Sequence, residues 1–405
     1  MKRLTLLVMT LCLTLVFGVG AGLAAEKKDP LAAWKAKFDP SGAEYTYILS
    51  NISHPVIEGV GFGYRLRDRV WEDSKGRLYV DFRPLAQLGG EKDVINKLKL
   101  GAVHGMLSSS VAAANVADTL GIVNLPYVVD TFDKLDTFRS DPELWKPFSE
   151  AAMSSGIMVA DVTGYGHYGW ATTIPVKSIA DAKGVNFRIA EAPVNTDSYK
   201  AWGLKFTVMP WPDVPQALQT GVINGLDHTA IVCNITKKFT IAKSFTQLNY
   251  AQGLFIHLMN KRWLDKLPAD LQQILMTAIV EESAKTRELT RKQHEDQVAK
   301  AKEAGVAFHK LSDAEKQQLL EAAEMRMAQS FKAISHESLR NSQEQFLNLA
   351  RTALRTQQDE ARGEIEKRRQ AVESMVRPVA ESPGMARALA ATLRELRACG
   401  AGGAE

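Results

Sequence analysis

Residues 184–209 decide the fold and read GVNFRIAEAPVNTDSYKAWGLKFTVM. The segments 186–189 and 205–209 are short and rich in aromatic and β-branched residues, which is typical of strands. The segment 196–203 lies between them, has the length of a short helix and ends at Gly203. A strand, a helix and a second strand in this order predict an α/β fold.

The same alternation continues outward in both directions. Downstream, the pattern predicts a helix at 213–220, a turn at 221–227 that leads into a short strand, and a further strand at 251–261. Upstream, it predicts strands at 45–50, 77–82, 102–108, 156–162 and 168–173, and helices at 62–74 and 91–100. We therefore expect two α/β lobes, lobe I at 40–163 and lobe II at 164–254, with a mostly parallel sheet in lobe I.

The C-terminal third is predominantly helical in pattern. Residues 270–304 predict one long amphipathic helix that can brace the two lobes, and Ser312 with Glu315 forms a capping box that begins another helix. We assign 255–348 to lobe I together with these bracing helices. The segment 349–405 is rich in charge and is expected to be a C-terminal helical extension or a loosely ordered tail, either without a role in binding or serving oligomerisation or partner docking.

The N-terminus has the pattern of a secretory signal peptide at 1–25. Lys2 and Arg3 precede an apolar run that ends in small residues at Ala25. The alternative is an uncleaved membrane anchor, but glycines interrupt the run short of the length that a membrane span needs. Leu11 before Cys12 does not fit a lipid-anchored protein. We therefore expect an exported and soluble mature protein.

Composition excludes several classes of protein. The 405 residues are 45% hydrophobic and 24% charged, which is ordinary for globular domains. The net charge of +4 includes Lys2 and Arg3, so the chain after residue 25 carries about +2 (4 minus 2), and nothing suggests nucleic-acid binding. Cys233 and Cys399 are far apart in sequence, so neither a structural disulfide nor a metal site of cysteines is expected. No cofactor is expected.

Local motifs of catalysis are missing from the sequence. It contains no nucleophile elbow, zinc-binding helix motif, phosphate-binding loop or dinucleotide fingerprint. Because catalytic groups are assembled in space, this lowers the expectation of an enzyme without excluding one. The enzyme alternative would use Asp227 and His228 as an acid and base pair.

Two residues suggest a binding site instead. Arg188 ends a predicted strand, where open α/β sheets face their ligands, and a guanidinium can hold a carboxylate through two parallel hydrogen bonds. The alternative is internal pairing with Glu191 or Asp227. Trp211 stands between two prolines on a short loop, which makes its ring either an apolar wall for a ligand or a part of the core.

Four stretches resemble the periplasmic binding subunits of TRAP (tripartite ATP-independent periplasmic) transporters, the DctP-like family. The first two are the run 87–91 followed by Leu98 and Gly101, and the turn 125–127, Leu-Pro-Tyr. The others are Asp181-x-x-Gly184-x-x-x-Arg188 and the run 217–225, AlaLeuGlnThrGlyVal followed by Gly225. The last two together are specific, and the resemblance covers roughly residues 45–335.

The resemblance implies two α/β lobes with a long bracing helix that close on a small organic acid. Arg188 matches the carboxylate-binding arginine of the family, and Trp211 matches an aromatic ring over the ligand. Ser109 and Asn51 lie near its first-lobe contacts. The implied partners are the organic acid and the membrane subunits of a TRAP transporter, which the protein would serve without itself being membrane-embedded.

Three positions depart from the pattern of the family. Glu191 and His228 stand where many members have asparagine, and Tyr168 aligns with a second arginine. A ligand with one carboxylate and with hydroxyl, amine or ring groups facing these side chains is therefore expected rather than a dicarboxylate. If Glu191 neutralises Arg188, the carboxylate itself is in doubt. A third alternative keeps the binding fold but couples it to a sensor.

Overall fold

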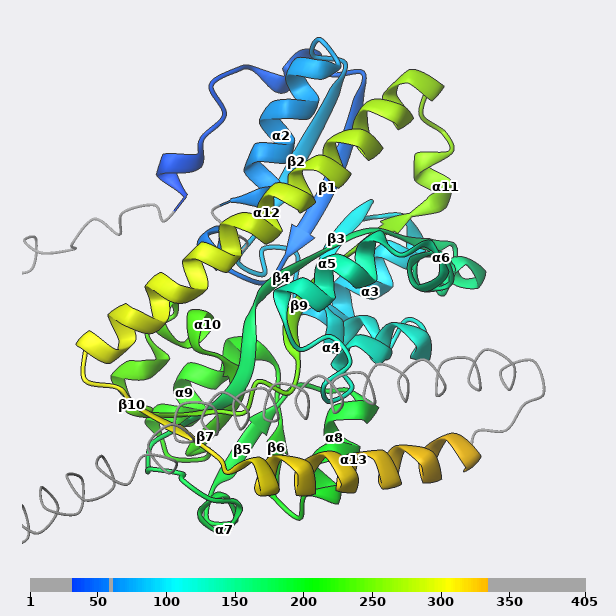
Figure 1. The fold of residues 1–405 in the computed structure, drawn as a ribbon. Coiled ribbons are helices and arrows are strands. Elements are labelled where there is room, and N and C mark those ends of the chain that lie inside the picture. Colours follow the sequence, from blue (N-terminus) through cyan, green and yellow to red (C-terminus); the bar gives the residue numbers. More distant parts are fainter. Residues whose placement is uncertain (1–30, 58–60, 334–405) are drawn as a thin grey trace, which may run out of the picture.

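The computed structural model describes residues 31–57 and 61–333, and it forms two α/β lobes (Figure 1). In lobe I, strand β1 (Tyr45–Asn51) pairs in parallel with β2 (Leu78–Arg83) and with β3 (Gly105–Ser109). Strand β3 then pairs antiparallel with β9 (Gln252–Asn260), which itself pairs antiparallel with β4 (Ile157–Thr172). The predicted parallel sheet is therefore correct for β2, β1 and β3 but not for the two strands that follow them.

Lobe II is built on the second half of strand β4. The second half of β4 pairs antiparallel with β7 (Gly225–Thr229), and β7, β5 (Asn186–Ile189) and β6 (Lys205–Val208) pair in parallel in that order. Strand β8 (Ser244–Gln247) pairs with β4 on one side and with β10 (Ala307–Lys310) on the other. The strand, helix and strand predicted from residues 184–209 are confirmed, and the two strands pair in parallel.

Strand β4 corrects the expectation of separate strands at 156–162 and 168–173. It is one strand of 16 residues that crosses from lobe I into lobe II, with irregular pairing to β9 between Gly164 and His167. The glycines at 164 and 166 look like a break in the sequence, but they instead bend a continuous strand. Because β4 and β9 pair with each other and reach both lobes, they form the connection between them.

Helices cover both sheets, and those predicted at 62–74, 91–100, 196–203 and 213–220 are present. The shorter helices α4, α7, α10 and α11 were not predicted from the sequence, and neither were α5 and α6, which together span only 132–150 with Pro147 inside α6. The helices before the long one are α2 (Phe62–Asp73), α3 (Glu91–Leu100), α4 (Ser110–Ala113), α5 (Phe132–Ser140), α6 (Pro142–Glu150), α7 (Ile179–Ala182), α8 (Pro193–Ala201), α9 (Val214–Gln219), α10 (Ala230–Ile235) and α11 (Lys261–Leu264).

Helix α12 (Ala269–Glu303) is the predicted brace, and it runs diagonally across the molecule (Figure 1). Leu271, Leu275 and Ile279 near its start are fully buried in the core of lobe I. Ala301 near its end is fully buried in a core cluster of lobe II. One helix is thus buried at its two ends against two different lobes.

The residues after α12 belong with lobe II rather than with lobe I. Strand β10 pairs with β8, and helix α13 (Asp313–Ala333) packs on α8, where the Trp202 Nε1–H donates to the carbonyl of Leu319 at 2.7 Å. The chain leaves α12 at lobe II, so 307–333 join the nearer sheet; the assignment of this part of 255–348 to lobe I was wrong. The predicted capping box is present, since Ser312 and Glu315 exchange hydrogen bonds.

The signal peptide expected at 1–25 and the extension expected at 349–405 lie outside the described residues. Within residues 31–57 and 61–333, no helix is long and apolar enough to cross a membrane.

Candidate functional site

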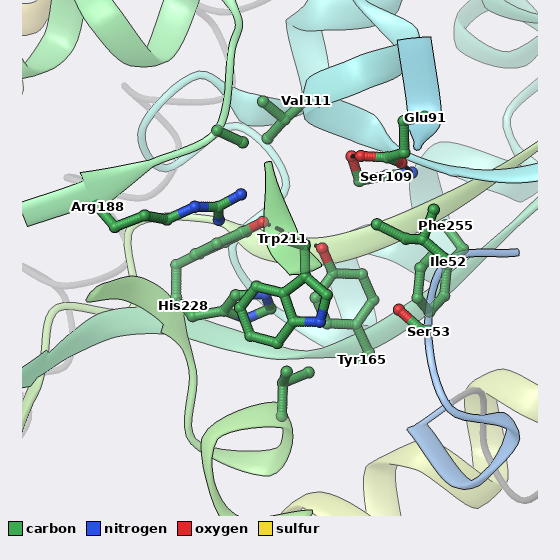
Figure 2. Close-up of a pocket in the computed structure, with 13 residues that line it drawn as sticks. Ile52, Ser53, Glu91, Ser109, Val111, Tyr165, Arg188, Trp211, His228 and Phe255 are labelled. Carbon is green, nitrogen blue, oxygen red and sulfur yellow. Dashed lines mark hydrogen bonds between the residues drawn. The ribbon is translucent and has the colours of Figure 1, made fainter. Parts of the chain in front are cut away.

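A pocket lies between the two lobes, where strand ends from both of them meet (Figure 2). The space among its side chains is about 440 Å³, part of which is open to solvent. Its 13 lining residues come from both lobes and from the crossing strands: Ile52, Ser53, Glu91, Ser109, Val111, Tyr165, Tyr168, Arg188, Ala190, Trp211, His228, Val232 and Phe255.

Arg188 reaches into this pocket from β5 (Figure 2). Its Nε–H and Nη2–H both donate to the carbonyl of Met209, at 3.0 and 2.9 Å, which fixes the plane of the guanidinium. In the described part of the chain this guanidinium forms no ion pair, so the alternative of internal pairing with Glu191 or Asp227 is not realised in the structure. The N–H groups of Nη1 and the second one of Nη2 remain for a bidentate acceptor.

Burial makes the charge of Arg188 costly. The residue is only 6% exposed, and burial lowers the pKa of its guanidinium, an effect that Tyr168, Glu91 and Asp227 oppose. Because an arginine keeps its proton in proteins, the free-energy cost of burying its charge is reduced only by the acceptors and anions that can reach it. An anionic group in the pocket would supply the missing counter-charge.

Trp211 begins a short 3-10 helix (Trp211–Asp213), and its ring contacts both cationic side chains and apolar core residues. Its ring lies 5.5 Å from the guanidinium carbon of Arg188 and 4.9 Å from the Lys238 ammonium, distances at which a cation and a ring attract each other. The same ring is half-buried and packs against the cores of both lobes. Both alternatives for Trp211 are therefore met, because it belongs to the core edge and also lines the pocket.

His228 faces the ring of Trp211, with 4.6 Å between the ring centroids. Its Nδ1 accepts the backbone N–H of Thr229 at 2.9 Å, which leaves the proton of the neutral ring on Nε2. Burial, together with the positive charges of Arg188 and Lys238, lowers the pKa of His228 well below its usual value. His228 is thus a neutral hydrogen-bond donor in this environment.

Two tyrosines from the crossing strand line the floor of the pocket. The hydroxyls of Tyr165 and Tyr168 are 3.1 Å apart, and burial raises the pKa of both phenols. They stay neutral and offer a pair of polar atoms beside Arg188. Tyr168 therefore lies where it was expected, whereas Tyr165 was not singled out from the sequence.

Glu91 is a charged pocket residue that sequence reasoning also missed. It begins α3, and its carboxylate accepts the backbone N–H of Ser109 at 2.6 Å and the Ser109 hydroxyl at 2.9 Å. Burial raises the pKa of Glu91, while these two hydrogen bonds and the charge of Arg188 oppose the shift. Its place in the run 87–91 was a signal of the family, but no spacing in the sequence directs it toward Arg188.

Three of the expected site residues lie outside the pocket lining. Asn51 is fully buried and bonds to the carbonyl of Leu107 and to the backbone N–H of Ser53, so it shapes the loop after β1. The side chain of Glu191 is 68% exposed, lies 3.7 Å from Lys92 and does not line the pocket that holds Arg188. The expectation that Glu191 faces the ligand or neutralises Arg188 is not met by this geometry.

Asp227 is the third of these residues, and its position corrects the acid and base pair of the enzyme alternative. Neighbouring residues on a strand point to opposite faces of the sheet. Asp227 therefore faces the lobe II core, where its carboxylate accepts the Tyr250 hydroxyl at 2.6 Å, while His228 faces Trp211. The two side chains are not placed to exchange a proton with one ligand.

No group of three or more metal-binding side chains gathers anywhere in residues 31–57 and 61–333. The described site thus consists of a fixed arginine, aromatic walls, neutral polar groups and one carboxylate, enclosed between two lobes. A site of this kind, on this fold, defines a two-lobed binding protein for a small solute.

Comparison with known proteins identifies the family. A model of the bacterial extracellular solute-binding proteins, family 7, matches residues 54–333, and the chain belongs to this family. It is 25% identical over 291 residues to the 2,3-diketo-L-gulonate-binding periplasmic protein YiaO of Escherichia coli, a match that covers 71% of this chain and 84% of YiaO.

Solved structures show the same fold. A TRAP periplasmic solute-binding protein from Shewanella oneidensis with bound succinate superposes with a TM-score of 0.70 at 19% identity, over 76% of this chain and 99% of that one. The sugar-acid-binding protein DctPAm from Advenella mimigardefordensis in complex with galactonate gives a TM-score of 0.70 at 21% identity, over 76% and 98%. The predicted family and the two-lobed fold with a bracing helix are both confirmed.

Proposed function

We propose that this protein captures a small carboxylate-bearing ligand in the periplasm and delivers it to the membrane subunits of a TRAP transporter. The observation that carries the proposal is Arg188, a buried guanidinium that lies in the pocket with a fixed plane, without an ion pair in the described residues and with N–H groups to spare. Relatives that bind organic acids support the same reading of the site.

The mechanism is hinge closure on the strands that cross between the lobes. The ligand carboxylate binds Arg188, the rings of Trp211 and Tyr168 cover its apolar surface, and residues of lobe I approach from the other side. Closure removes water from the ion pair, which strengthens it. The closed shape then reports to the membrane partner that the pocket is occupied.

A thermal-shift screen of residues 26–405 tests the ligand class. The panel contains organic acids, sugar acids, amino acids and aromatic acids, with uncharged polyols as the control. A ligand at about 100 times its Kd stabilises the folded state by about 2.7 kcal/mol, which raises Tm visibly. We expect acids to raise Tm and polyols to leave it unchanged; a response to polyols alone would show that Arg188 is structural.

A further inference from the structure

The pocket has an acidic wall as well as a basic one. Figure 2 shows Glu91 and Ser109 on the side opposite Arg188, with the two charged side chains reaching toward the same space. Glu91 comes from lobe I and Arg188 from lobe II, so any ligand held between the lobes lies between the two charges.

Ser109 fixes the position of the Glu91 carboxylate. The hydroxyl of Ser109 donates to one Glu91 oxygen at 2.9 Å and accepts the backbone N–H of Ala112 at 3.1 Å, while the Ser109 N–H donates to the other Glu91 oxygen at 2.6 Å. The only proton of this hydroxyl is therefore committed to Glu91. Ser109, expected as a ligand contact, lines the pocket and also positions the carboxylate.

The Glu91 carboxylate keeps acceptor capacity that the described residues do not use. Each oxygen of an ionised carboxylate accepts up to about two hydrogen bonds, and each receives one from Ser109. No lysine or arginine of the described residues forms an ion pair with Glu91. The unused acceptor sites belong to a carboxylate that lines the pocket, where a ligand donor can reach them.

We propose that Glu91 determines specificity by accepting hydrogen bonds from a hydroxyl or ammonium group of the ligand, whose carboxylate lies on Arg188. This inference rests on the proposed function and specifies the chemical group at the end of the ligand opposite its carboxylate. A dicarboxylate would direct its other carboxylate at Glu91, where two like charges meet in a partly desolvated space and repel. The preferred ligands are therefore monocarboxylic acids that carry a donor group at the far end.

Two pairs of probes isolate that far end. Galactonate and galactarate differ only in a terminal group, which is hydroxymethyl in the first and carboxylate in the second. In the same way, 4-aminobutyrate and glutarate have spacers of equal length and differ only in a terminal ammonium or carboxylate group. Isothermal titration calorimetry on the protein lacking residues 1–25 gives Kd for each probe. We expect at least one monoacid to bind tenfold or more tightly than its diacid partner, a difference of about 1.4 kcal/mol.

The variant Glu91→Gln keeps the size of the side chain and removes its charge. It should reduce the ratio of diacid Kd to monoacid Kd at least tenfold, and Ser109→Ala should reduce it less by loosening Glu91. Asp93→Asn is the matched control, because it removes an acid from the same first turn of α3 outside the pocket. That variant should leave the ratio within about twofold, since it loses only the interaction with the helix dipole.

The pattern of results separates the two halves of the ligand. If the galactonate pair responds to Glu91→Gln, the donor is a hydroxyl; if the 4-aminobutyrate pair does, it is an ammonium. The role of Glu91 is overturned if the diacids bind wild type as tightly as their monoacid partners, or if Glu91→Gln leaves the ratio of Kd values unchanged. In either case the proposed function still stands when Arg188→Lys weakens the binding of every acid. If Arg188→Lys weakens none of them, or no acid binds, the proposed function fails as well.

Discussion

Asp227 is a buried acid that the binding site does not use. It is 4% exposed, and burial raises its pKa from the usual 3.8 to about 7, although Tyr250, Arg188 and Tyr199 favour the charged form. Between about pH 4 and pH 7 the folded protein therefore holds a proton on Asp227 that the unfolded chain has lost. The free energy of unfolding consequently falls as the pH rises through this window.

The variant Asp227→Asn should remove this part of the pH dependence. An amide keeps an oxygen for the Tyr250 hydroxyl and does not titrate, so the variant should gain stability relative to wild type between pH 5 and pH 7.5, by roughly 2 kcal/mol. Urea unfolding at several pH values measures it, with Asp93→Asn as an exposed control. A constant difference between variant and wild type at all pH values would contradict the assignment.

At the scale of single residues, the sequence predicted those site residues whose position follows from their own strand or loop. Arg188 and Trp211 sit at strand and loop ends that can be located from the chain alone, and both line the pocket. Glu191 was expected at the ligand because it stands three residues after Arg188, where many members of the family have asparagine. Sequence distance misled here, because the loop after β5 turns Glu191 to the surface, whereas α3 brings Glu91 in from the other lobe.

Among the elements, the crossing strand β4 packs closely against the brace at Gly166. Gly166 in β4 has φ +102°, and a Cβ built there would lie 3.0 Å from Nδ1 of His294 on α12 and 3.1 Å from Ile231 on α10. Both the left-handed backbone and the close approach favour glycine. The bend in β4 is thus held in contact with α12 and α10.

Gly166→Ala should therefore destabilise the protein by about 2–4 kcal/mol, since an unfavourable backbone conformation adds to overpacking. Gly203→Ala is the matched control, because Gly203 has φ +66° and no atom within 4 Å of a built Cβ. It should cost only about 1 kcal/mol. Chemical denaturation compares the two variants, and equal losses would show that the contact with His294 and Ile231 has no energetic role.

Elements with a clear period or a clear cap were predicted well. The helix at 270–304 and the capping box at Ser312 match α12 and the start of α13 closely. The bend at Gly164 and Gly166 was interpreted as a lobe boundary. Glycines in the sequence look the same whether they end a strand or bend a continuous one. Only the pairing with β9 distinguishes the two cases.

In the whole molecule, polar contacts join the lobes at the rim of the pocket. Asn115, from lobe I, donates its side-chain N–H to the carbonyl of Glu191 in lobe II at 3.0 Å, and the Lys92 ammonium lies 3.7 Å from the Glu191 carboxylate. The ion pair is exposed and contributes little. The hydrogen bond of Asn115 is the better candidate for holding the lobes together.

Asn115→Ala should accelerate release of a bound acid by about two- to tenfold with little change in the association rate, because one neutral hydrogen bond contributes about 0.5–1.5 kcal/mol. Stopped-flow displacement measures the release rate. The partly exposed Asn195 on α8 serves as the control in Asn195→Ala. An unchanged release rate would show that this contact does not stabilise the closed form.

The division into lobes shows what the sequence can predict at this scale. The two lobes and the brace follow from element order, because alternating strands and helices have few stable arrangements. The placement of 307–333 does not follow, since β10 pairs with β8, a strand more than 50 residues earlier. Such a long-range pairing leaves no local mark in the chain.

The central claim is that Arg188 binds the carboxylate of the ligand between the lobes, and calorimetric titration of Arg188→Lys tests it most directly. Arg67→Lys is the matched control, because Arg67 is also buried, donates to a backbone carbonyl and lies 4.9 Å from the ring of Tyr64, but it is outside the pocket. For any acid identified in the screen, we predict that Arg188→Lys weakens binding at least tenfold, about 1.4 kcal/mol, while Arg67→Lys leaves Kd unchanged. Wild-type affinity in Arg188→Lys, or an equal loss in both variants, would contradict the account.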